Sequence, residues 1–173
     1  MNPLGRLVAG ALCCAVSSLG LAAPATDPNV AAEPTEVAPM TVGVALSLST
    51  AKPGDTVAIL GTVRLLPGWH TYASVPAGKP YIQTKWSIDP PEGLSVVGDW
   101  LTPAAVPDPR DTELTIYEGE KLTFAHPIKV ADTASGDQTV RVSIFFQTCN
   151  LEHCLAPTRK SFDLKLSVGS AKS

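Results

Sequence analysis

Residues 139–146 read TVRVSIFF, and they decide the fold class because every second residue of this segment, from Val140 on, is apolar. Successive side chains of a β-strand point to opposite faces, so the apolar ones share a single face: Val140, Val142, Ile144 and Phe146. Alternation of this kind predicts a half-buried antiparallel strand with one face toward a core and the other toward water.

The same period of two recurs on both sides of this segment. It appears in residues 41–50, 56–66, 84–88, 94–101, 121–130 and 161–168. Turn sequences separate these segments, as in AKPGD at residues 51–55, and no stretch has a convincing period of 3.6 residues. Seven to nine short strands in about 130 residues predict an all-β fold, an immunoglobulin-like antiparallel β-sandwich.

The first residues, MNPLGRLVAGALCCAVSSLGLAAPA, have the layout of a secretory signal peptide. One positive charge, Arg6, precedes an apolar run and then small alanines. The run of about fifteen residues is shorter than the ~20 that a membrane-spanning helix needs. We therefore predict a signal peptide over residues 1–23, and we take Cys13 and Cys14 to leave with it.

The rest of the chain divides into a linker and one domain. Residues 24–40, PATDPNVAAEPTEVAPM, contain four prolines and no aromatic residue. Such a composition buries too little apolar surface to offset the entropy of ordering, and it predicts a flexible linker. Residues 41–170 are expected to form a single domain. No second apolar segment is long enough to span a membrane, so we expect no membrane insertion after signal removal.

Charge excludes some classes of partner. The chain has 13 Lys and Arg against 16 Asp and Glu, and removal of residues 1–23 takes away one base and no acid, which leaves a net charge of −4. Nucleic acids and anionic membranes require clustered basic residues, so neither is expected as a partner. Hydrolase motifs such as G-x-S-x-G and H-E-x-x-H are absent from the sequence.

The two remaining cysteines lie in FFQTCNLEHCLAP, residues 145–157, and their spacing admits three interpretations. Export favours a disulfide between Cys149 and Cys154, which is either a structural link or a redox pair. As a structural link it gains little, because closing about six residues stabilises by only about 2 kcal/mol. As a metal site the cysteines would join His153, and His126 in addition, to bind copper(I). However, a histidine on the apolar face of a strand is more often bonded to backbone.

Residues 102–114, TPAAVPDPRDTEL, interrupt the alternation with three prolines and four charges. We expect a long loop here, and long loops in compact domains are either functional or simply variable surface. Aromatic residues gather in GWHTY, residues 68–72, after a Pro-Gly turn. In the plainer interpretation, Trp69 or Tyr72 packs in the core.

Together these segments resemble the N-terminal periplasmic domain of the thiol:disulfide interchange protein DsbD family. The resemblance covers roughly residues 42–168 and is carried by PGWHTY, IYEGE and VSIFFQTCNLEHCLAP. Its most specific part is an aromatic–Gln strand end, two cysteines and a nearby proline: Phe146, Gln147, Cys149, Cys154 and Pro157. Domains of this family are immunoglobulin-like sandwiches, in agreement with the strand pattern.

The resemblance implies a role for each matching residue. Cys149 and Cys154 would be the exchanging pair, with Cys154 attacking and Cys149 resolving, and a protonated His153 would favour the thiolate. His70 and Tyr72 match the aromatic residues that shelter the pair, although His70 replaces a tyrosine. The family's cap loop would lie within residues 102–114, around Pro107, Asp108 and Pro109. This cap departs from the family because it has no aromatic residue.

The resemblance also implies a thiol:disulfide oxidoreductase that works in the periplasm without a cofactor or a metal ion. Its partners would be thioredoxin-fold periplasmic proteins. A separate membrane protein would donate the electrons, because the family's membrane domain and thioredoxin-like domain are not in this sequence. Two other functions compete with this one. One is a non-catalytic, partner-binding sandwich with a structural disulfide, and the other is a copper-binding or copper-protective protein that uses the same thiols.

Overall fold

The computed structural model describes residues 30–169, in which the regular elements are β-strands. The predicted signal peptide, the start of the predicted linker and residue 170 lie outside the described residues. No helix within residues 30–169 has the length and apolar character to cross a membrane. The strands are β1 (Met40–Leu46), β2 (Thr50–Ala51), β3 (Thr56–Leu65), β4 (His70–Ser74), β5 (Lys85–Asp89), β6 (Leu94–Val96), β7 (Val106–Asp108), β8 (Asp111–Glu118), β9 (Leu122–Val130), β10 (Gly136–Phe146), β11 (Thr148–Cys149) and β12 (Thr158–Val168).

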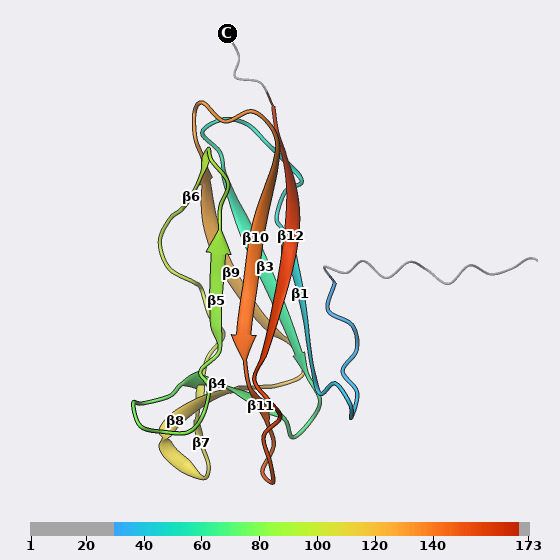
Figure 1. Cartoon of the computed structure of the whole chain (residues 1–173), viewed down its shortest axis with the longest axis vertical. Helices are drawn as coiled ribbons and strands as arrows, with labels where there is room; N and C mark the ends of the chain where they lie inside the picture. The colour runs from blue at the N-terminus through green and yellow to red at the C-terminus, as the bar shows by residue number, and fades with distance from the viewer. Residues whose placement is uncertain (1–29, 170–173) are drawn as a thin grey trace, which may run out of the picture.

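Two four-stranded sheets pack face to face and form a β-sandwich (Figure 1). One sheet has the strand order β1-β3-β9-β6 and the other the order β2-β12-β10-β5. Their pairings are antiparallel, except for the short parallel contact of β12 with β2. The all-β class and the immunoglobulin-like sandwich expected from the sequence are confirmed.

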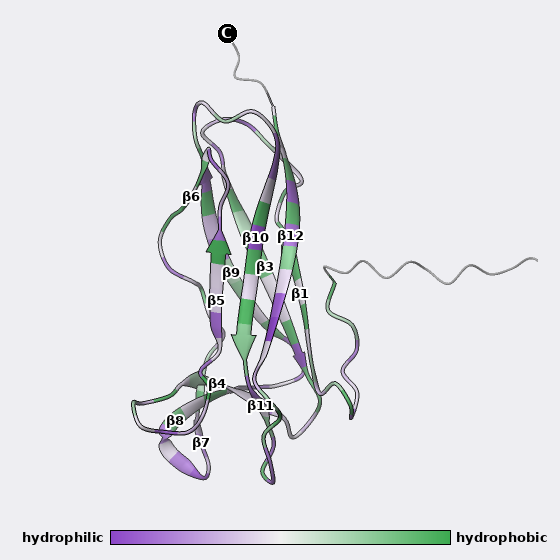
Figure 2. Cartoon of the chain, viewed as in Figure 1, coloured by the Kyte–Doolittle hydropathy of each residue, from purple (hydrophilic) through white to green (hydrophobic). Residues whose placement is uncertain are grey.

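Alternation in β10 positions its side chains as predicted. Val140, Val142 and Ile144 are fully buried, whereas Arg141 forms an exposed ion pair with Asp163 of β12. Apolar side chains of both sheets meet in one large hydrophobic cluster. Figure 2 shows hydrophobic positions, coloured green, alternating with hydrophilic ones along the long strands. Burial of this surface, at about 25 cal/mol per Å², is the main force that holds the two sheets together.

The number of strands exceeds the predicted seven to nine, since the described residues form twelve. The additional strands are short: β2 and β11 have two residues each, and β7 has three. The predicted strand at residues 94–101 is also shorter than expected, because β6 has only three residues. Alternation is recognisable only over about four or more residues, so a periodic pattern does not reveal strands of this length.

A third sheet, with the order β11-β4-β8-β7, lies at one end of the sandwich, the lower end in Figure 1. Residues 102–114 were expected to form a loop, and that prediction was wrong: they contain β7 and the first part of β8, which pair as an antiparallel hairpin. β7 is an edge strand, and edge strands tolerate proline because one side of their backbone needs no partner. Pro107 therefore fits within the hairpin despite its missing N–H.

Part of the predicted linker contacts the sandwich. The Thr41 hydroxyl donates a hydrogen bond to the carbonyl of Ala32 at 2.5 Å, and Glu33 forms an ion pair of 2.6 Å with Arg64 of β3. An ion pair with this much exposure contributes about 1 kcal/mol or less. These contacts hold the residues before β1 against the first two strands of the sheet.

Candidate functional site: a cysteine pair at the end of the sandwich

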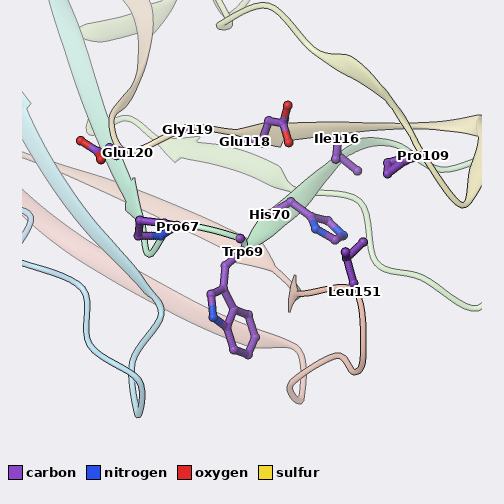
Figure 3. A pocket seen from close by; sticks show the side chains of 10 residues that line it. Pro67, Trp69, His70, Pro109, Ile116, Glu118, Gly119, Glu120 and Leu151 are labelled. Atoms are coloured by element: carbon purple, nitrogen blue, oxygen red, sulfur yellow. The ribbon is translucent and has the colours of Figure 1, made fainter.

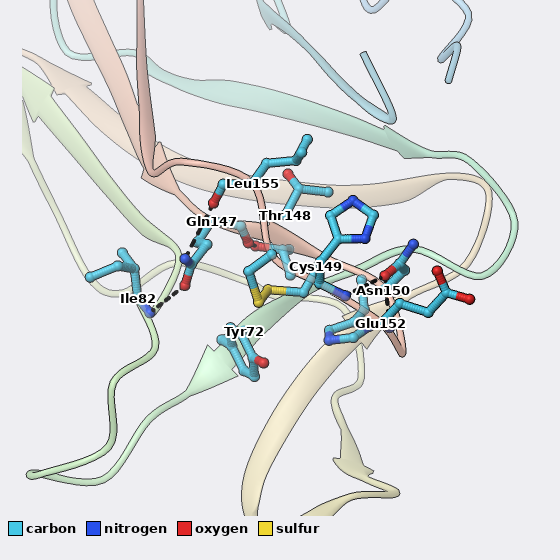
Figure 4. Close-up of a disulfide and its surroundings, with 12 residues drawn as sticks. Tyr72, Ile82, Gln147, Thr148, Cys149, Asn150, Glu152 and Leu155 are labelled. Carbon is cyan, nitrogen blue, oxygen red and sulfur yellow. Dashed lines mark hydrogen bonds between the residues drawn. A yellow bond between two sulfur atoms is a disulfide. The ribbon is translucent and has the colours of Figure 1, made fainter. Parts of the chain in front are cut away.

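Cys149 and Cys154 form a disulfide in the third sheet (Figure 4). Their sulfurs are 2.03 Å apart and their Cα atoms 4.0 Å apart. Cys149 ends β11, pairs with His70 of β4, and forms a β-bridge with Cys154. The chain therefore turns back on itself between the two cysteines, and their sulfur atoms are joined across this turn.

Asn150 shapes the turn between the cysteines. Its Oδ1 accepts hydrogen bonds from the backbone N–H groups of Glu152 and His153, each at 2.9 Å. The N–H of Asn150 donates to the carbonyl of His153 at 3.0 Å. An asparagine that bonds the backbone two or three residues further on stabilises a tight turn. These bonds do not involve sulfur, so we expect the turn to keep its shape when the disulfide is reduced.

Gln147 and Thr71 anchor the cysteine turn to the third sheet. Gln147 Oε1 accepts a hydrogen bond from the N–H of Ile82 at 3.1 Å, and its Nε2 donates to the carbonyl of Leu155 at 3.3 Å. The Thr71 hydroxyl donates to the carbonyl of Gln147 at 2.9 Å and lies 2.6 Å from the hydroxyl of Thr84. Both ends of the turn are thus fixed, one before Cys149 and the other after Cys154.

The two cysteines differ in exposure. Cys149 is fully buried, while Cys154 is half-buried. Cys149 belongs to a small hydrophobic cluster with Tyr72, Leu114 and Ile116, and this cluster is separate from the main core. Cys154 packs against the edge of the same cluster. Of the two residues, Cys154 is therefore the one that an incoming protein or reductant can approach.

Aromatic rings lie beside the disulfide. Tyr72 is fully buried, stacks on Tyr81 with ring centroids 4.7 Å apart, and meets the edge of His70 at 5.5 Å. His70 is the backbone partner of Cys149. Offset and edge-to-face arrangements of this kind add stability beyond that of the buried area. The rings form a rigid apolar support for the buried cysteine.

Arg110, in the turn between β7 and β8, connects this hairpin to the cysteine turn. Its Nη1 donates to the carbonyl of Asn150 at 3.0 Å, and its Nη2 lies 3.2 Å from His70 Nε2 and 3.3 Å from the Tyr72 hydroxyl. The same guanidinium forms an ion pair with the buried Asp108 carboxylate at 3.1 Å. One side chain therefore joins three segments of the third sheet.

A second contact fixes the β7–β8 hairpin on its other side. Lys79, in the turn after β4, places its Nζ 2.6 Å from a carboxylate oxygen of Asp111 and 2.6 Å from one of Glu113. Both acids belong to β8. The hairpin is thus attached by one cation from its own turn and by another from a neighbouring turn.

Burial and the Arg110 charge set the protonation states at the site. Burial alone would raise the pKa of Asp108, but hydrogen bonds from the side chain and backbone of Arg110 outweigh it, and the pKa lies below its ordinary value. Burial raises the pKa of Tyr72 to about 12. Burial also lowers the pKa of His70, and the Arg110 charge acts in the same direction. At neutral pH the site therefore contains one ion pair, a neutral imidazole and a neutral phenol.

We expect His70 to titrate below the ordinary histidine value of 6.5. Its unfolded form then holds more protons than its folded form just below pH 6.5, so this residue makes the free energy of unfolding fall as the pH drops through that range. Two-dimensional NMR of the three histidines, with His70→Gln as the variant that assigns the resonance, measures the pKa. A His70 pKa at or above 6.5 would contradict the buried, Arg110-facing geometry.

A cavity of about 420 Å³ opens beside the cysteine turn (Figure 3). Its walls include Trp69, directly before β4, His70, the first residue of β4, and Leu151 of the cysteine turn. Two acidic residues also line it: Glu118, the last residue of β8, and Glu120, in the turn after β8. The Trp69 ring meets the His153 ring edge-on, with centroids 5.3 Å apart. The cavity is thus directly continuous with the segment that carries the disulfide.

Most of the predicted site residues gather in this region: Cys149, Cys154, His70, Tyr72, Gln147 and Asp108. Asp108, which was expected within the cap loop, is fully buried and pairs with Arg110. Pro109 borders the cavity. Pro107 on β7 and Pro157 on the segment leading to β12 are both exposed.

The histidines named as metal ligands lie in different environments. His126 is buried in β9 and its Nδ1 lies 2.9 Å from the carbonyl of Pro127, as the backbone-bonded interpretation predicts. His153 is exposed and packs on Trp69. In residues 30–169, no three His, Cys, Asp or Glu side chains are close enough together to hold a metal ion.

Several residues of the site were not predicted, among them Asn150, Tyr81 and Arg110. Asn150 has a recognisable signal, because an asparagine directly after a strand-end cysteine is a frequent turn former. Arg110 has none, since its importance depends on the pairing of β7 with β8 and on the distance that this pairing sets to the cysteine turn. Tyr81 likewise reaches Tyr72 only through the fold of the turn after β4.

Solved structures of similar shape include two bacterial domains. The Neisseria meningitidis DsbD N-terminal domain in the reduced form is 19% identical, with a TM-score of 0.41 over 69% of this chain and 82% of that chain. The N-terminal periplasmic domain of ScsB from Proteus mirabilis is 22% identical, with a TM-score of 0.43 over 72% of this chain and 44% of that chain. No curated protein matches the sequence.

The family assignment rests on the sequence itself. The family model described as "Thiol:disulfide interchange protein DsbD, N-terminal" matches residues 36–166. This range contains the third sheet, both cysteines and nearly all of the sandwich. It therefore takes in every residue that builds the disulfide site. The chain belongs to the family of the N-terminal domain of the thiol:disulfide interchange protein DsbD.

Proposed function

We propose that this protein passes reducing equivalents through Cys149 and Cys154 to periplasmic proteins of thioredoxin fold. Its family is one of thiol–disulfide exchange modules, and its two cysteines form a disulfide. The observation that carries the proposal is the unequal burial of this pair, with Cys149 fully buried and Cys154 half-buried at the end of a rigid sandwich. A cysteine pair that exchanges disulfides with another protein needs one sulfur that the partner can reach and a second sulfur close enough to resolve the mixed disulfide.

The proposed reaction starts from the dithiol form. The Cys154 thiolate attacks one sulfur of the partner's disulfide, so that a mixed disulfide forms and the partner's other sulfur leaves as a thiolate, which takes up a proton. The Cys149 thiol then loses its proton and attacks the Cys154 sulfur, which releases the partner's second thiolate. The partner gains two electrons and two protons, and this protein ends as the disulfide. A separate membrane donor restores the dithiol.

The surrounding residues have supporting roles in this proposal. His70 and Tyr72 support the buried cysteine, and Gln147 holds the strand end and the segment after Cys154 together. The β7–β8 hairpin, with Pro107, Asp108 and Pro109 around its turn, is the cap. In place of an aromatic residue, it reaches the cysteine turn through the Arg110 guanidinium. Export by a signal peptide over residues 1–23 would bring the domain to the periplasm.

The reduction potential of the 149–154 disulfide, measured against a glutathione or dithiothreitol buffer, tests the proposal. Structural disulfides have potentials below about −300 mV, and exchange-active ones lie higher. We expect a value above that limit, together with reduction of oxidised protein disulfide isomerase by the dithiol form; this thioredoxin-fold probe has a potential of about −180 mV and is therefore a stronger oxidant than thioredoxin. A potential below the limit with no thiol exchange would instead support a non-catalytic, partner-binding sandwich with a structural disulfide.

A further inference from the structure

We infer that the cavity beside the disulfide is a subsite for a lysine or arginine side chain that flanks the cysteines of the partner. The inference rests on the proposed function and adds to it a preference among partners. It is carried by the position of the cavity, the chemistry of its walls and the charge at its border.

The cavity is lined by residues that neighbour the two cysteines in the sequence and in the third sheet. Leu151 is three residues from Cys154 and contributes to the cavity wall, and its side chain is 67% exposed. His70, which pairs with Cys149, forms the adjoining wall. Neighbouring residues of an extended chain are only about 3.3 Å apart along it. A partner with a sulfur at Cys154 therefore brings its flanking side chains against these walls.

The walls suit a long side chain with an apolar stem and a charged end. Leu151 offers exposed aliphatic surface, the largely buried Trp69 and Ile116 form the apolar part of the lining, and Glu118 and Glu120 also line the cavity (Figure 3). Lysine and arginine place their methylene groups on apolar surface while the charge stays at the edge. A glutamate or aspartate would meet like charge instead.

The negative charge at the border is not neutralised by nearby cations. Among residues 30–169, neither Glu118 nor Glu120 forms an ion pair. Lys121 follows Glu120 in the chain, but it lines a different cavity, over β1 and β3. Arg110 is engaged by Asp108, and burial together with the Arg110 charge lowers the pKa of His70, which favours its neutral form at neutral pH. The charged groups that line the cavity are thus both acidic.

Reduction of small disulfides with defined flanking residues tests this inference. The probes are the symmetrical disulfides of three blocked tripeptides, Lys-Cys-Lys, Leu-Cys-Leu and Glu-Cys-Glu, mixed with the dithiol form of the protein at low ionic strength. Each rate is divided by the rate with which dithiothreitol reduces the same peptide, because flanking charges also change the reactivity of a disulfide. We expect the lysine peptide to react about fivefold faster than the leucine peptide, as one exposed ion pair allows, and the glutamate peptide to be slowest.

The matched variants separate a local subsite from overall charge. Glu118→Gln combined with Glu120→Gln should abolish the lysine preference. Glu92→Gln combined with Asp99→Asn changes the net charge equally at exposed positions outside the cavity lining and should keep the preference. Salt at about 1 M should reduce it by screening. Equal normalised rates for the three peptides, or equal effects of the two double variants, would overturn the subsite. A dithiol that reduces none of the peptides would overturn the proposed exchange function itself.

Discussion

Cys154→Ser is expected to reduce the rate of exchange with an oxidised thioredoxin-fold probe, protein disulfide isomerase, to the uncatalysed background. The serine hydroxyl is not ionised near neutral pH and does not attack a disulfide, and the remaining thiol of Cys149 is fully buried in the cluster around Tyr72. Thiol exchange requires an accessible thiolate. Stopped-flow measurement of the reduction of this probe gives the rate, and loss of activity is the largest effect that any single replacement here should have.

Cys149→Ser is the complementary variant and should give a different product. Cys154 still attacks, but no second thiol resolves the complex, so a mixed disulfide accumulates and is detected by non-reducing electrophoresis and mass spectrometry. Both variants lose a ring of about six residues, which lowers stability by only about 2 kcal/mol, and circular dichroism should show both folded. Trapping through Cys149 in the Cys154→Ser protein would reverse the two roles.

Arg110→Ala should open the site to small reductants. The replacement removes the hydrogen bond to the Asn150 carbonyl and the contacts with His70 and Tyr72. A hydrogen bond from a charged donor stabilises by about 1.5–3 kcal/mol, so dithiothreitol should reduce the disulfide about tenfold faster. The variant should also lose about 2–4 kcal/mol of unfolding free energy, because a buried carboxylate at Asp108 is left without its cation.

The loss of stability in this variant should depend on pH. In the native protein the pKa of Asp108 lies below its ordinary value, so its contribution is present above about pH 4 and is lost as the pH falls through the folded pKa. Without Arg110, burial raises this pKa instead. The difference in unfolding free energy between Arg110→Ala and the native protein should therefore be largest near neutral pH and should shrink toward pH 3.

Two further variants distinguish opening of the site from general destabilisation. Adding Asp108→Asn to Arg110→Ala removes the unpaired charge and should recover part of the stability while reduction stays fast. Arg141→Ala breaks an exposed ion pair with Asp163 and should leave both quantities nearly unchanged. The rate of disulfide reduction in Arg110→Ala should rise in proportion to the dithiothreitol concentration. A rate that does not depend on this concentration would show that unfolding, and not opening of the site, limits reduction. An unchanged reduction rate in Arg110→Ala would show that this side chain does not guard the disulfide.

The sandwich is predictable from the sequence because its long strands have enough residues to show the alternation of apolar and polar side chains. β10 and β12 each have eleven residues, and over that length the period of two identifies both the strand and its buried face. β7 and β11 lack this information. They are strands only because β8 and β4 lie beside them. β7 depends on a hairpin with the strand that directly follows it, and β11 depends on a strand far away in the sequence.

The site was predicted in the same uneven way. Cys149, Cys154, His70 and Tyr72 fall together as expected, since the family motif reflects their proximity in the fold. The cap was predicted within residues 102–114 as a loop without an aromatic residue, whereas this segment contains β7 and the first part of β8. Arg110 of this segment reaches the cysteine turn through contacts of its long side chain, and a pattern of apolar residues contains no information about such contacts.

The division of apolar side chains into two clusters has a consequence for how this protein tolerates change over evolution. A substitution in the main core chiefly alters the population of folded molecules, whereas one among the residues around Cys149 also alters the surroundings of the disulfide in each folded molecule. Changes in the main core can therefore adjust stability while the disulfide keeps its immediate neighbours. A change of reactivity at the disulfide has a cost in stability, because its neighbours Tyr72, Leu114 and Ile116 are themselves buried.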